Sequence, residues 1–130
     1  LSAVHFALQD AEQLATSMVT HGAKATFAFS FRTAGRTDYL RLGIIIYKDG
    51  LYLCGIDSSV DGVRIAGDNG LVSGALEIER MNLETGHYVA VFSVLDGARY
   101  LLRGSPVHFQ VVSSRAHSGF VDLPHAWHLA

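Results

Sequence analysis

The chain has 130 residues, enough for one domain with a single hydrophobic core, and 49% of them are hydrophobic. Its net charge is −2 and its Lys and Arg residues are scattered, which excludes a basic surface for nucleic acid or an anionic membrane. No apolar stretch approaches the ~20 residues that a membrane span needs. Cys54 is the only cysteine, which excludes an intrachain disulfide and mildly favours a reducing compartment.

The first part of the chain, residues 1–20, fits two patterns. Apolar side chains recur at helical spacing from Val4 to Met18, yet the segment also suits extended structure. We predict extended structure, because a helix would leave the strands that follow without an opening strand. The chain begins without Met or a signal-peptide pattern, so we expect a piece of a longer protein or a mature domain.

The middle of the chain alternates with period two. Every second side chain is apolar in residues 25–32 and again in 40–47, as half-buried strands require. Asp49-Gly50 then predicts a tight hairpin, because these residues tolerate positive φ angles, and 51–56 is the returning strand. We expect loops at 33–38 and 57–69, the second with one short extended piece.

The second half continues with strands and turns. Leu76 and Ile78 alternate with Glu77, strand-like residues follow Tyr88, and Asp96-Gly97 marks a turn before short strands at 100–102 and 107–112. About six or seven strands with regular turn signals predict an all-β fold, an antiparallel β-sandwich. Its expected core residues in three of these strands are Leu42, Ile44, Ile46, Ala90, Phe92, Val94, Phe109 and Val111.

The segment from Leu83 to Tyr88 is the most specific structural signal. A Leu, a turn Gly at 86 and a Tyr entering an apolar strand are typical of a tyrosine corner, in which the Tyr hydroxyl bonds to backbone a few residues upstream. This motif favours an immunoglobulin-like sandwich, a fold that is used mostly for binding.

Signatures of enzymes are missing from the sequence. There is no phosphate-binding P-loop, no G-x-S-x-G elbow and no H-E-x-x-H. Cys54 lies within a predicted strand, where a small buried hydrophobe is the favoured role. We therefore expect no catalytic residues and no cofactor; an ATPase domain would have to precede this chain.

Two clusters of polar residues invite a catalytic interpretation that we do not favour. Histidines gather at the C-terminus and could reach one metal ion with Asp122, but alternation would turn His125 and His128 to opposite faces, so we expect no metal site. Glu77 and Glu79 could pass for a paired acid and base, but a solvated outer face is the simpler interpretation.

The faces of the strands that point away from the core carry better binding signals. Ile45, Val89 and Val91 lie there among polar and aromatic groups, and such a mixed face suits a glycan. An equally weighted alternative, compatible with the first, is that another strand or subunit covers the apolar members. The predicted glycan-binding residues are Arg41, Tyr47, Ser93, His108 and Gln110.

With the strands placed, the chain resembles the C-terminal domain of Wzt, the ATPase subunit of ABC transporters that export bacterial O-antigen polysaccharide. The resemblance rests on residues 42–58 with the Asp49-Gly50 hairpin, on the tyrosine corner, on Phe109-x-Val111 and on the tail 119–127 with its final Trp. Asp57-Ser58 departs from the family, which often has Asn-Thr there.

The resemblance implies a carbohydrate-binding sandwich that recognises completed, often terminally modified O-polysaccharide before export. It also implies a cytoplasmic homodimer, peripheral to the inner membrane through the ATPase and membrane subunits, in which the C-terminal strand is exchanged. We expect residues 1–118 to form the sandwich, and residues 119–130 to follow a hinge and pair with the other protomer, where Trp127 is an anchor. The rival hypothesis is a structural or dimerisation domain that docks onto an ATPase domain without binding sugar; an enzyme with a histidine metal site is a distant third.

Overall fold

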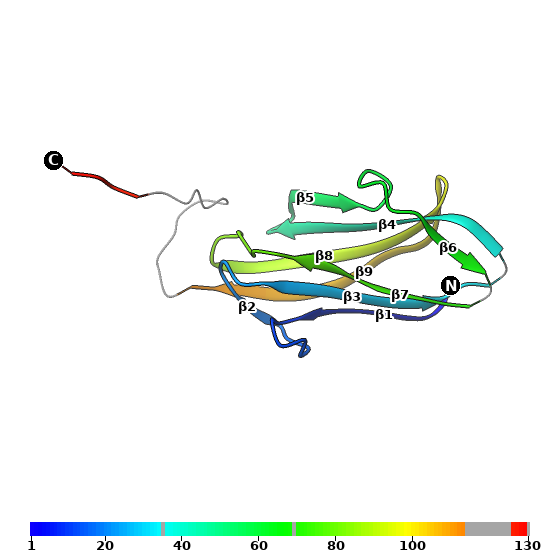
Figure 1. The fold of residues 1–130 in the computed structure, drawn as a ribbon, viewed down its shortest axis with the longest axis horizontal. Helices are drawn as coiled ribbons and strands as arrows, with labels where there is room; N and C mark the ends of the chain where they lie inside the picture. Colours follow the sequence, from blue (N-terminus) through cyan, green and yellow to red (C-terminus); the bar gives the residue numbers. More distant parts are fainter. Residues whose placement is uncertain (35, 69, 114–125, 130) are drawn as a thin grey trace.

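Two β-sheets pack face to face in the computed structural model, which describes all residues except 35, 69, 114–125 and 130 (Figure 1). The described residues form nine strands and no helix, so none of them belongs to a helix that could cross a membrane. The strands are β1 (Ser2–Gln9), β2 (Met18–Thr20), β3 (Ala25–Arg32), β4 (Arg36–Lys48), β5 (Leu51–Asp57), β6 (Ile65–Asp68), β7 (Leu71–Ile78), β8 (Gly86–Asp96) and β9 (Arg99–Val112).

The smaller sheet has the order β1-β3-β7, and the larger has the order β2-β9-β8-β4-β5, with β6 paired to β4. The predicted all-β sandwich is confirmed, and β4, β8 and β9 are neighbours in one sheet as expected. One pairing departs from the antiparallel arrangement, because β2 runs parallel to β9. After β1 the chain crosses to the other sheet and enters beside β9 in the same direction.

The N-terminal segment is extended, as predicted. Asp10 closes the turn between β1 and β2, because its Oδ1 accepts hydrogen bonds from the backbone N–H groups of Glu12 at 2.9 Å and Leu14 at 3.0 Å. The helical spacing of apolar residues has no structural role here, since Leu14 and Met18 are both exposed.

The core lies between the sheets and is rich in aromatic rings. Phe6 stacks on Phe92 with ring centroids 4.8 Å apart, and Tyr88 stacks on Phe109 at 5.6 Å. Stacked pairs of this kind contribute beyond their buried area. All the core residues predicted in β4, β8 and β9 are buried.

The tyrosine corner is present. The Tyr88 hydroxyl donates a hydrogen bond of 2.6 Å to the backbone carbonyl of Glu84, in a fully buried setting. Burial, and secondarily the charge of Glu84, raise the pKa of the Tyr88 phenol. The tyrosine corner therefore fixes the start of β8, the strand that carries Val89, Val91 and Ser93.

Two strand boundaries differ from the prediction. β4 begins at Arg36, inside the expected loop, because it pairs there with β6, the short extended piece expected within 57–69. The expected strands 100–102 and 107–112 are one strand, β9, with register shifts opposite Phe92 to Leu95. Bulges accommodate extra residues without ending a strand.

Candidate functional site

The outer face of the larger sheet carries rows of side chains that cross neighbouring strands. Tyr47 of β4 pairs with Val89 of β8, and Val89 pairs with His108 of β9. Val89 lies between the buried Tyr88 and Ala90, so this row points away from the core. In the next row His87 pairs with Gln110.

These rows border an open groove of about 480 Å³ beside the β4–β5 hairpin. Three predicted glycan-binding residues, Tyr47, His108 and Gln110, line it together. The other lining residues are Ser17, Asp49, Gly50, His87, Tyr88, Val89 and Phe109. The groove thus combines aromatic surface with imidazole, amide, hydroxyl and carboxylate groups.

Tyr52 of β5 extends the aromatic surface next to Tyr47. The two rings meet edge to face, with centroids 6.1 Å apart and planes at 87°. Tyr47 pairs with Tyr52, while Ile46 pairs with Cys54, so a bulge at Leu53 brings the two tyrosines onto one face. Tyr52 is 58% exposed, which leaves its ring accessible to a ligand.

Arg41 and Ser93, the other predicted site residues, lie on the same face but outside this groove. Arg41 pairs with Leu95 and Ser93 pairs with Gly43. Arg41 is six residues from Tyr47 along β4, about 20 Å at the rise of an extended strand. The structure therefore places three of the five predicted residues at the groove and the other two farther along the same face.

Arg41 is held by Asp57 at the far end of β5. Its Nε donates to Asp57 Oδ2 at 2.6 Å, and Asp57 Oδ1 accepts from the backbone N–H and the hydroxyl of Ser59. Partial burial opposes ionisation of Asp57, but the hydrogen bonds from Ser59 and Arg41 outweigh it and lower the pKa of that carboxyl. Ser58 Oγ accepts from the backbone N–H of Leu42 at 2.8 Å, so the Asp57-Ser58 pair is fully engaged.

Comparison with solved structures shows which fold this chain has. The crystal structure of the C-terminal domain of Wzt aligns over 100% of this chain and 86% of that chain, with a TM-score of 0.86 and 19% sequence identity. The chain has the fold of the Wzt C-terminal domain. The resemblance read from the sequence is thus confirmed at the level of the fold.

Other comparisons add nothing to this assignment. The soluble domain of PmoD from Methylocystis sp. aligns over 84% of this chain and 90% of that chain, at 17% identity and a TM-score of 0.45, which is too low to show a shared fold. No protein-family model matches the sequence, and no curated protein matches it.

Within the Wzt C-terminal-domain fold, sequence reasoning missed part of the groove. His87 could have been predicted, because it lies two residues before Val89 and therefore on the same face of the strand. Tyr52 could not be found this way, because the bulge at Leu53 changes the alternation of β5. Asp49 and Ser17 reach the groove from a hairpin and from the edge beside β9.

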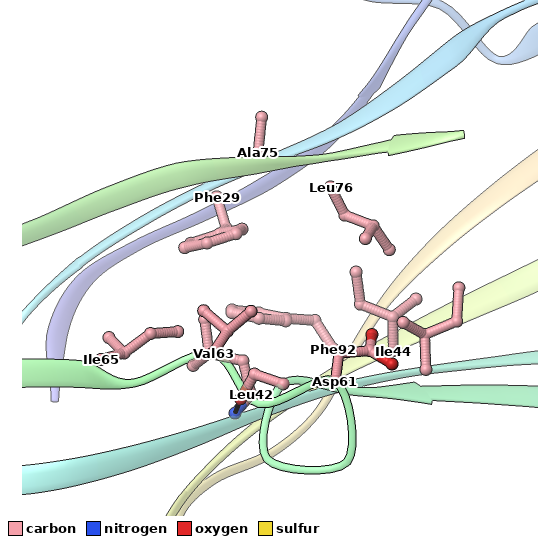
Figure 2. A pocket seen from close by; sticks show the side chains of 11 residues that line it. Phe29, Leu42, Ile44, Asp61, Val63, Ile65, Ala75, Leu76 and Phe92 are labelled. Atoms are coloured by element: carbon pink, nitrogen blue, oxygen red, sulfur yellow. Dashed lines mark hydrogen bonds between the residues drawn. The ribbon is translucent and has the colours of Figure 1, made fainter. Parts of the chain in front are cut away.

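A second cavity of about 140 Å³ lies between the sheets (Figure 2). Phe29 and Leu76 lie on one side of it, opposite Leu42, Val63 and Phe92. Asp61 is the only charged residue among those described as lining it. This apolar slot of the Wzt-like sandwich offers few partners to sugar hydroxyls, so we place the candidate site in the groove.

The alternative chemical clusters remain without support. Among the described residues, no three His, Cys, Asp or Glu side chains are placed to hold a metal; His117, His125 and Asp122 lie outside those residues. Cys54 is half-buried and packs on the core, and burial raises its pKa. Glu77 forms an exposed ion pair with Lys24 at 3.3 Å, which confirms the solvated outer face.

Proposed function

We propose that this chain is a non-catalytic carbohydrate-binding module that recognises bacterial O-antigen polysaccharide, at its terminal modification, for export by an ABC transporter. The observation that carries the proposal is the groove on the outer face, which Tyr47, His108 and Gln110 line together, with the ring of Tyr52 next to Tyr47. The likeness to the Wzt C-terminal domain supports it through the fold.

The groove matches the chemistry of a sugar. The C–H face of a pyranose is apolar and packs on aromatic rings, for which Tyr47 and Tyr52 supply two surfaces at right angles. Sugar hydroxyls both donate and accept hydrogen bonds, and the Gln110 amide and the His87 and His108 imidazoles can do both. Binding by stacking and planar polar groups needs no reacting side chain.

The number of carboxylates described in the groove favours glycan binding over glycan hydrolysis. Most glycoside hydrolases use two carboxyl groups that flank the scissile bond. Asp49 is the only carboxylic acid among the described residues that line the groove. A single carboxylate can accept hydrogen bonds from a sugar but does not form the pair that this chemistry requires.

The proposal includes the setting of the domain. It places the chain in the cytoplasm, peripheral to the inner membrane through the ATPase and membrane subunits of the transporter. It also includes a homodimer in which residues 119–130 exchange between protomers. In the single chain Trp127 is 83% exposed and Leu129 is 90% exposed, so both side chains are available to pack against a partner.

The second candidate function is a structural or dimerisation domain that docks onto an ATPase domain without binding sugar. Ile45, Val89 and Val91 favour it, because they form an apolar strip on the outer face. A protein partner would cover this strip and would also close the groove.

Calorimetric titration of the folded chain with a panel of purified bacterial O-polysaccharides distinguishes the two functions. We expect saturable binding to at least one polysaccharide and weaker binding by the Tyr47→Ala variant. Glu77→Gln is the matched control, because this exposed residue lies on the other sheet. Failure of every polysaccharide to bind would favour the docking function.

A further inference from the structure

A tyrosine and an arginine form a cation–π pair at the end of the outer face that lies farther from the groove. Tyr100 of β9 is 46% exposed, and the guanidinium carbon of Arg103 lies 4.1 Å from the centroid of its ring. A guanidinium over a ring face is attracted by the ring quadrupole and is held in place by it. Neither residue is among the five predicted glycan-binding residues.

The register shows that this pair shares a face with the groove. Leu95 pairs with both Arg41 and Tyr100, so a row crosses β4, β8 and β9 here as well. The register shift next to Val94 leaves Leu101 and Leu102 both packed against the core. Tyr100 and Arg103, on either side of those two leucines, are therefore both exposed on the outer face.

Charge distinguishes Arg103 from the neighbouring arginines. Arg41 forms an ion pair with Asp57 at 2.6 Å, and Arg99 lies 3.7 Å from Asp96. Among the residues that the structure describes, no carboxylate lies within ion-pair distance of Arg103. Its guanidinium is thus held by an aromatic ring and retains donors for an anion.

The surface between the two ends has one position without a side chain. Gly43 lies there, paired with Ser93. A Cβ atom at Gly43 would approach no atom closer than Ile56 O at 4.0 Å, so packing does not require glycine there. The absence of a side chain at Gly43 leaves an open path along the strands.

We propose that the outer face binds the glycan as an extended chain and that Tyr100 and Arg103 form a second subsite, which takes an anionic substituent of the glycan, a carboxylate or a phosphate. This inference rests on the proposed function. The rows at Tyr47 and Tyr100 are about 20 Å apart, farther than one sugar ring reaches. Only a chain of several sugars, lying over Gly43, contacts both.

The probe is the O-polysaccharide that binds in the calorimetric panel, cut into size-graded fragments. Affinity should rise with fragment length until a fragment spans both rows and then level off. Arg103→Gln should weaken binding of long fragments about ten-fold, the loss of one charge-assisted hydrogen bond, and leave short fragments unaffected. Arg99→Gln is the matched control, because Asp96 already engages that arginine.

Two further arms test the path and the anion separately. Gly43→Val should place a side chain on the path and reduce the affinity of long fragments to that of short ones, with an unchanged unfolding midpoint. Carboxyl-reduced and phosphate-free fragments, prepared in parallel, identify the anion. Removal of the correct group should lower the affinity of the wild-type protein about as much as Arg103→Gln lowers its affinity for native fragments.

The outcomes separate a failure of the proposed function from a failure of the extended-chain binding mode. If no polysaccharide binds, the proposed function fails and this inference fails with it. If binding depends on Tyr47 but not on fragment length or Gly43→Val, the proposed function stands and the extended chain is wrong. If the binding polysaccharide is neutral, or Arg103→Gln has no effect on an acidic one, the anionic subsite is wrong.

Discussion

The ring of Tyr52 lies over Gly55, so close that a Cβ atom at position 55 would stand 2.5 Å from the Tyr52 hydroxyl oxygen. The absence of a side chain at Gly55 therefore makes room for the Tyr52 ring in its edge-to-face contact with Tyr47. This contact couples a backbone position on β5 to the aromatic surface of the groove.

Gly55→Ala should displace the Tyr52 ring and weaken glycan binding by about 1 kcal/mol, the contribution of one aromatic contact. The free energy of unfolding should change little, because the displaced atoms are the exposed end of a flexible side chain. Calorimetry and urea denaturation measure the two effects. In a Tyr52→Ala background the same substitution should add nothing, and an additive loss would show that Gly55 acts in another way.

Tyr47→Ala should remove a stacking surface and cost about 1–3 kcal/mol of binding while the fold stays intact. Tyr47→Phe keeps the ring and should retain most of the affinity. Titration of both variants with the same polysaccharide checks this. Unchanged affinity in a folded Tyr47→Ala variant would mean that the glycan binds elsewhere.

Tyr88→Phe should destabilise the sandwich by about 1–3 kcal/mol, because the carbonyl of Glu84 would lose its buried hydrogen bond. Equilibrium unfolding in urea gives the change directly. The substitution keeps the ring that borders the groove, so glycan affinity, measured at a temperature where the variant is folded, should stay close to that of wild type. A loss of affinity in the folded variant would show that the corner also shapes the groove.

The lowered pKa of Asp57 predicts a dependence of stability on pH. A carboxyl whose pKa is depressed by folding contributes stability that is fully present above its unfolded-state pKa and is lost as pH falls through its folded-state pKa. Asp57→Asn should therefore flatten the acid side of the stability profile relative to wild type. Urea midpoints taken across the acid range give both curves, and parallel curves would contradict the assignment.

Deletion of the residues after Ser118 should give a monomer or an aggregate in light scattering, if the tail exchanges between protomers. A soluble, well-folded dimer from that truncation would rule the exchange out. Trp127 is the only tryptophan of the chain, so its fluorescence reports on the tail alone. Emission should shift to shorter wavelength as dimers form, whereas constant, water-like emission at all concentrations would contradict burial in the partner.

Local sequence patterns were enough to predict the elements that depend only on residues close together in the chain. Asp49 and Gly50 have φ angles of 51° and 77°, as their hairpin required. The alternation in β4 and β8 placed the core correctly, because successive side chains of a strand must face opposite sides. The hydrogen bond of the Tyr88 hydroxyl was also predictable, since the tyrosine corner spans only a few residues.

The tertiary structure decided what depends on pairing between distant strands. The bulge at Leu53 put Tyr52 beside Tyr47, the pairing of β6 extended β4 back to Arg36, and the register shifts of β9 brought Tyr100 and Arg103 to the outer face. A shift of one residue moves a side chain to the other face of a sheet. The partner strand therefore determines which face a residue occupies after a bulge. The periodicity of the bulged strand alone does not predict that face.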